Sequence, residues 1–103
     1  MATQTILSSG TASTTGYSKI IPDNAPASRS LQVTVVGTGA VTATVLIAGS
    51  ADGQAYVDLA SFSLSGTNSA SDRVSVTFSE PHLKATLSAI SGTSAVATAS
   101  VAY

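Results

Sequence analysis

Few residues of this chain have side chains suited to catalysis. His82 is the one histidine, and Glu80 lies just before it in the sequence. A serine nucleophile needs a base that a third group orients. Serines are so frequent that one near His82 would carry little information, and the Gly-x-Ser-x-Gly motif is absent. We therefore predict that the protein is not an enzyme and name no catalytic residue.

The acidic side chains are candidates for a metal site. Asp52, Asp58 and Asp72 fall in or beside expected loops, and loop oxygens are ligands that Ca²⁺ accepts. The EF-hand pattern is absent, however, and Asp-Gly pairs are frequent in tight turns because of their backbone conformation alone. For Asp52-Gly53 we favour a turn between two strands, and we predict no metal and no other cofactor.

Aromatic side chains are the third candidate chemistry, because ligand sites are often lined by aromatic rings. The chain has no Trp, and its aromatic residues are Tyr17, Tyr56, Phe62, Phe78 and Tyr103. Tyr56 has the phase of Phe62, so we expect it in the core. Val57 and Leu59 have the opposite phase, which predicts a β-bulge or burial of both faces. A carbohydrate- or receptor-binding module stays open as the alternative function.

Charged residues are scarce. They make up 9% of the chain, against about 25% in typical proteins, and the net charge is −1. Such a chain has no field that attracts nucleic acid or an anionic membrane, so we predict neither as a partner. A surface of low charge is poorly protected against association. Either neighbouring subunits cover this surface, or the protein is a monomer rich in hydroxyl groups.

The elements follow from an alternation of apolar and polar residues that runs from Leu31 to the C-terminus. The strongest candidate strands are residues 31–36, 41–47, 56–64, 74–78, 83–89 and 95–103. Weaker candidates at residues 4–8 and 17–21 raise the number from six to eight. This spacing predicts an all-β protein, an antiparallel β-sandwich of the jelly-roll or immunoglobulin-like type with six to eight strands.

Turns rich in glycine separate these segments. Gly37-Thr38-Gly39 and residues 91–94 predict hairpins, and residues 65–72 predict a polar loop. The stretch GTGAVTATV from Gly37 resembles GTSAVATAS from Gly92. We attribute this likeness to shared hairpin chemistry and not to a duplication.

The first thirty residues are less regular than the rest. We predict that residues 1–30 form an extended N-terminal arm or the first strands, and that residues 31–103 form the β-sandwich domain. Apolar residues in an irregular region often belong to an interface. The candidate interface residues are Ile6, Leu7, Tyr17, Ile20 and Ile21.

The sequence also indicates the cellular compartment in which the protein folds. Without cysteine, disulfides and thiolate metal sites are excluded. The first residues lack the basic start and apolar run of a signal peptide, and no stretch approaches the roughly 20 consecutive apolar residues of a membrane-spanning helix. We therefore expect synthesis and folding in a cytoplasm, and no membrane partner.

From Leu31 onward the sequence resembles the small virion structural proteins of tailed bacteriophages. The shared motifs are a Gly-Thr-Gly turn, an apolar strand ending in Gly-Ser, an Asp-Gly pair with a following aromatic, a Ser-Gly-Thr loop, and a proline-led strand ending in Ala-Ile-Ser-Gly-Thr. They occupy residues 37–39, 49–53 with Tyr56, 65–67, 81–87 and 89–93. The aromatic is Tyr56 where the family commonly has Trp, and His82-Leu83-Lys84 replaces an aromatic-Val-Arg run.

This resemblance implies a β-sandwich on the surface of a virion. It implies a capsid decoration, or cement, protein that stabilises the shell by binding between major capsid protein subunits. The implied partners are the major capsid protein and further copies of the chain in a homotrimer. The implied location is the capsid surface, after synthesis in the host cytoplasm.

Overall fold

The computed structural model describes residues 3–12, 14–17, 21, 28–78 and 80–103. These residues form strands and connections without a helix, and so contain no helix long and apolar enough to cross a membrane. The strands are β1 (Thr3–Gly10), β2 (Thr14–Tyr17), β3 (Ser28–Ser50), β4 (Val57–Thr77) and β5 (His82–Ala102). They form one antiparallel sheet in the order β1-β5-β3-β4, with β2 also paired to β5. The all-β prediction is confirmed.

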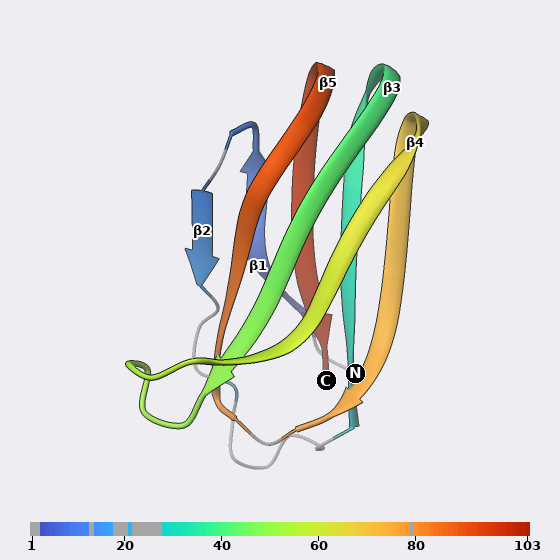
Figure 1. Cartoon of the computed structure of the whole chain (residues 1–103). Helices are drawn as coiled ribbons and strands as arrows, with labels where there is room; N and C mark the ends of the chain where they lie inside the picture. The colour runs from blue at the N-terminus through green and yellow to red at the C-terminus, as the bar shows by residue number, and fades with distance from the viewer. Residues whose placement is uncertain (1–2, 13, 18–20, 22–27, 79) are drawn as a thin grey trace.

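The number of strands, five, is lower than the predicted six to eight, because each long strand covers two predicted ones. β3 continues through Gly37-Thr38-Gly39, where we predicted a hairpin. Val36 is paired with Ser69 of β4 and Val96 of β5, and both halves of β3 keep β4 and β5 as neighbours. The hairpin prediction is therefore wrong: the glycines bend one strand, and the sheet folds back on itself at this point (Figure 1).

The three long strands bend at the same level, at a shared motif. In each, a Gly-Thr pair precedes a residue with positive φ: 73° at Gly39, 67° at Asn68 and 55° at Ser94. Glycine and asparagine adopt this left-handed conformation more readily than other residues. The Gly39 N–H also donates a hydrogen bond to Asn68 Oδ1 over 2.9 Å, which joins two bends. The likeness between two of these stretches therefore reflects a repeated bend, and the predicted polar loop at 65–72 is part of β4.

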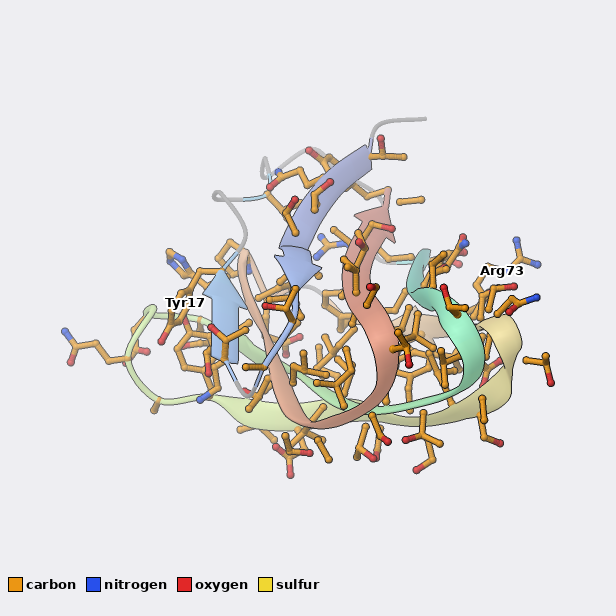
Figure 2. All side chains as sticks on the ribbon, turned by 90° about the horizontal axis from the view of Figure 1, so that it is seen from above. Tyr17 and Arg73 are labelled. Carbon is orange, nitrogen blue, oxygen red and sulfur yellow. The ribbon has the colours of Figure 1, made fainter. Side chains whose placement is uncertain are left out.

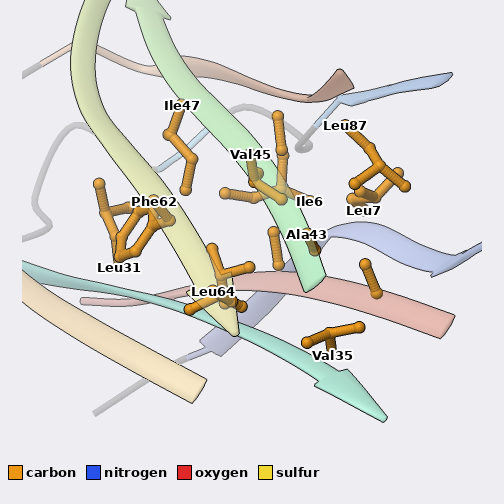
Figure 3. Packing of buried hydrophobic residues seen from close by; sticks show 14 of the residues in the cluster. Ile6, Leu7, Leu31, Val35, Ala43, Val45, Ile47, Phe62, Leu64 and Leu87 are labelled. Atoms are coloured by element: carbon orange, nitrogen blue, oxygen red, sulfur yellow. The ribbon is translucent and has the colours of Figure 1, made fainter. Parts of the chain in front are cut away.

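The core lies between the two facing halves of the folded sheet. Leu31, Val33 and Val35 project from one half and are fully buried. Val45 and Ile47 project from the other half and are equally buried, as the close view shows for several of these side chains (Figure 3). Each such side chain stabilises the fold by about 1.5–3 kcal/mol relative to exposure. The alternation in the sequence thus identified the inward faces correctly.

The N-terminal residues that the structure describes are strands of the same sheet. β1 pairs with the second half of β5, and β2 pairs with its first half. A register shift between Thr5 and Leu7 turns both Ile6 and Leu7 into the core. Two adjacent buried residues break the alternation, which explains why this segment looked irregular in the sequence.

The bulge predicted near the start of β4 is confirmed. Ile47 pairs with Ala60 and Ala48 pairs with Asp58, so Leu59 is the extra residue. The extra residue reverses the face of the sheet to which the residues before Leu59 project. Tyr56 is therefore only half-buried, and the prediction that it belongs to the core is wrong.

Candidate functional site

Two tyrosines and a lysine meet at the β2 side of the molecule, and we call Tyr17, Tyr56 and Lys84 the tyrosine cluster. Tyr17 ends β2 and is paired with Lys84 of β5. The rings of Tyr17 and Tyr56 are 6.2 Å apart between centroids and inclined by 59°. Lys84 Nζ lies 4.7 Å from the centroid of Tyr56, within the range of a cation–π interaction. The cluster therefore joins three segments that are distant in sequence.

The loop between β3 and β4 holds Tyr56 in this cluster. Asp52 Oδ1 accepts hydrogen bonds from the N–H groups of Gln54 and Ala55 at 2.9 and 3.0 Å. The hydroxyl of Ser50 donates to the same oxygen over 2.8 Å and accepts from the Gly53 N–H over 2.9 Å. These bonds are those of an Asx-type turn, and they hold the turn between two strands that we predicted at Asp52-Gly53.

The same hydrogen bonds set the charge state of this loop. The N–H groups of Gln54 and Ala55, followed by the hydroxyl of Ser50, lower the pKa of Asp52 to about 2. A carboxylate that accepts several hydrogen bonds is stabilised in its charged form. The Asp52 carboxylate therefore serves to order the backbone of the loop.

His82 packs against the loop at its glycine. Gly53 has a φ of +77°, and a Cβ built there would lie 3.4 Å from Cε1 of His82. The imidazole is half-buried against this backbone. His82 thus supports the loop that carries Tyr56, which is a structural explanation for its position at the start of β5.

The predicted acidic candidates do not come together. Among the residues that the structure describes, no three His, Asp or Glu side chains are placed to hold a metal ion. Asp52 lies in the loop, Asp58 at the start of β4, and Asp72 beyond the bend of β4. The geometry therefore brings aromatic rings together here, and not metal ligands.

The predicted interface residues differ in how exposed their side chains are. Ile6, Leu7 and Ile21 are buried in the core, at 3%, 4% and 1% exposure. The Ile21 N–H also donates to the Pro81 carbonyl over 2.9 Å. Tyr17, by contrast, is 62% exposed, and Ile20 lies outside the described residues. Of the candidates that the structure describes, Tyr17 is thus the exposed one, and the interface itself stays a prediction.

Three exposed apolar side chains on or beside β4 were missed by the sequence analysis. The other exposed large apolar residues are Val36, Val57 and Val74. Val57 and Val74 belong to β4, and Val36 is paired with Ser69 of β4. Figure 2 shows that Arg73, the neighbour of Val74, lies at the opposite end of the view from Tyr17, whereas Val57 directly follows Tyr56 of the tyrosine cluster.

A buried arginine was also missed. Arg29 is only 4% exposed, its Nη1 donates to the Glu80 carbonyl over 3.0 Å, and its guanidinium lies 4.7 Å from the Phe78 ring centroid. Loss of hydration lowers the pKa of Arg29, and the charge of Glu80 opposes that effect. These contacts join the start of β3 to the connection between β4 and β5, so we assign Arg29 a structural role.

Comparison of the sequence with protein-family models gives no match, and comparison with curated proteins gives none either. Neither comparison therefore assigns this chain to a family.

Proposed function

We propose that this protein is a structural component of a tailed-bacteriophage virion, most specifically a capsid decoration protein that stabilises the shell by binding between major capsid protein subunits. The observation that carries the proposal is the nature of the outer faces of the folded sheet. On β3 the outward residues include Gln32, Thr34, Thr42 and Thr44 beside the apolar Val36 and Leu46, and on β4 serines predominate, with Arg73 as an outward charge. The motifs of residues 31–103 that resemble virion proteins support the same assignment.

Outer faces with few charges suit a protein that works inside an assembly. The centres of interfaces between proteins are depleted of charged residues, because a charge that loses its water is costly. A hydroxyl group is cheaper to desolvate and finds a partner easily. Catalytic activity forms no part of this proposal. Its proposed location is the capsid surface, after synthesis in the host cytoplasm.

We also infer that the folded sheet is the β-sandwich that the sequence predicts. The halves of β3, β4 and β5 on either side of the bends give three segments to each layer, and β1 and β2 add a fourth to each. Each of β3, β4 and β5 then passes from one layer of the sandwich to the other at its bend. That connectivity differs from the jelly-roll and the immunoglobulin type, in which loops connect the sheets.

The direct test uses shells assembled from the major capsid protein encoded in the same genome. We expect the protein to sediment with these shells and to raise the temperature at which they break down. Bovine serum albumin at equal concentration serves as the control for trapped protein. If the protein stays in the supernatant at micromolar concentration and leaves shell stability unchanged, the decoration assignment is wrong.

The tyrosine cluster favours a second candidate, a carbohydrate- or receptor-binding module. Tyr17 is exposed and presents an aromatic surface beside the charged Lys84. A glycan array probed with the protein would then show specific binding. This binding would disappear in folded Tyr17→Ala and Tyr56→Ala variants, and an array without a signal would count against this candidate.

A further inference from the structure

β4 is the longest unprotected edge of the sheet. It extends over Val57–Thr77 and pairs only with β3 among the described residues. An edge strand presents a row of free backbone N–H and C=O groups, which is a template for another strand. From residue 59 to residue 71 it contains neither a charge nor a proline, the usual means of protecting an edge.

The other edges are protected in ways that β4 lacks. β2 has only four residues, and β1 has eight residues with two register shifts. Short and bulged edges pair poorly with a further strand. An added strand would therefore pair with β4 in preference to β1 or β2. Because each copy has one such edge, an assembly built on it would contain two copies and no more.

The inner face of β4 is also incompletely covered beyond its bend. Val74 is paired with Leu31, so both side chains point into the core, yet Leu31 is fully buried and Val74 is 37% exposed. Val57, near the beginning of the same strand, is 69% exposed. The apolar interior is thus open toward this edge, and an additional layer of apolar side chains would close it.

The strand has the symmetry of a self-complementary contact. Asn68 divides β4 into arms of nearly equal length, residues 57–67 and 69–77. Neighbouring strands of this sheet align their bends, as the pairs of Val36 with Ser69 and of Ala40 with Thr67 show. A second β4 placed antiparallel with its bend aligned would set each arm against the other arm of its copy.

We propose that a second copy of this chain docks along β4 by antiparallel strand pairing, with a two-fold axis beside the bend at Asn68. In this register Asp72 and Arg73 face the uncharged segment around Ser63 and Leu64 of the other copy, so no like charges oppose each other. Each folded half of the sheet then continues across the axis. The contact is isologous and closes as a dimer, in contrast to the homotrimer that the family resemblance implies. It does not depend on the virion assignment.

The three equivalent bends provide a matched set of probes. Thr38, Thr67 and Thr93 occupy the same place in their bends, and all three are exposed. Only Thr67 lies on the edge strand, beside the proposed axis. The chain has no cysteine, so each single Thr→Cys variant carries one thiol. In this register Thr67 lies diagonally across from Thr67 of the other copy, at about 7–8 Å. This distance is too long for an unstrained disulfide but within reach of a short bis-maleimide crosslinker, with which we expect Thr67→Cys to form a covalent dimer quickly. Thr38→Cys and Thr93→Cys should remain uncrosslinked.

A pair of charge variants tests the register without a crosslink. Ser63 is exposed and lies opposite Arg73 of the other copy in the proposed arrangement. We expect Ser63→Lys to raise the dissociation constant roughly tenfold through two symmetric like-charge contacts, and Ser63→Glu to leave it equal or lower. Circular dichroism and thermal unfolding of both variants would verify that they fold.

Sedimentation velocity and native mass spectrometry of the full chain over the micromolar range complete the test. The expected result is a monomer–dimer equilibrium, with crosslinking confined to Thr67→Cys and with the opposite responses of the two Ser63 variants. A protein that remains monomeric throughout this range overturns the proposal. So does a trimer, or crosslinking of Thr38→Cys or Thr93→Cys at the rate of Thr67→Cys.

Discussion

The two edges of this sheet differ in whether further strands cover them. On one side β5 is covered by β1 and β2, and side chains of the tyrosine cluster tie that side together. On the other side β4 ends the sheet with free backbone groups and small side chains. The first side can recognise a partner through side chains alone, whereas the second can extend the sheet itself. A chain with few charges thus still has two chemically different surfaces.

The largest expected effect comes from the same substitution on the two sides. Leu87 is fully buried in β5 beneath β1 and β2, and Leu64 is buried in β4 at 6% exposure. We expect Leu87→Ala to lower the free energy of unfolding by about 3–4 kcal/mol and Leu64→Ala by about 2 kcal/mol, because atoms near an open edge relax more easily into a cavity. Urea unfolding at low protein concentration measures both. Equal losses would contradict the difference between the two sides.

The covered side depends on a close backbone approach at Gly16. A Cβ at this position would collide with the Ile6 carbonyl oxygen and lie 2.9 Å from the Leu7 Cα. We expect Gly16→Ala to cost about 1–3 kcal/mol, since β2 must move away from β1. Thr15→Ala, on the exposed neighbouring residue, should be nearly neutral and serves as the control. Thermal unfolding compares the two variants, and a neutral Gly16→Ala would mean that β2 is held differently.

The bend of β4 depends on Asn68. Its side chain accepts the Gly39 N–H, and its φ of 67° lies in the left-handed region. We expect Asn68→Ala to lose about 1–2 kcal/mol, through the hydrogen bond and the backbone conformation together. Asn68→Gly should lose less, because glycine accepts this φ and only the hydrogen bond is removed. If chemical denaturation shows Asn68→Gly to be the less stable variant, the backbone conformation is not what selects asparagine here.

The smallest effect concerns pH and the loop that positions Tyr56. Folding lowers the pKa of Asp52 from 3.8 to about 2. The stabilising contribution is therefore complete above the ordinary pKa and is lost as the pH falls through about 2. We expect stability to decline between pH 4 and pH 2, and Asp52→Asn to remove part of this decline. Thermal unfolding across that range measures it, and a variant with an unchanged acid profile would exclude Asp52 as a contributor.

The sequence predicted the inward faces of the long strands well. Residues such as Val33, Val45 and Leu87 alternate with polar neighbours, and the pleat of a strand converts that alternation directly into burial. The bulge in β4 was one of two alternatives that the sequence left open, because Leu59 breaks the phase, and the register of β4 selects it.

The connections could not be predicted in the same way. A Gly-Thr-Gly stretch permits both a hairpin and a bend within one strand, and only the pairing of Val36 with residues of β4 and β5 decides between them. For the same reason the number of strands was overestimated. The tyrosine cluster was hidden because Tyr17 and Tyr56 meet only after β2 has paired with β5.

The most direct test of the difference between the two sides is amide hydrogen exchange of the full chain at two protein concentrations. At low concentration we predict that alternate amides along β4 exchange rapidly, while those in the centre of β5 are protected on both sides. At high concentration the rapid amides of β4 should become protected, and those of β1 and β2 should not change. If β4 is uniformly protected at low concentration, or if raising the concentration leaves its exchange unchanged, β4 is not an open edge that pairs with a second copy.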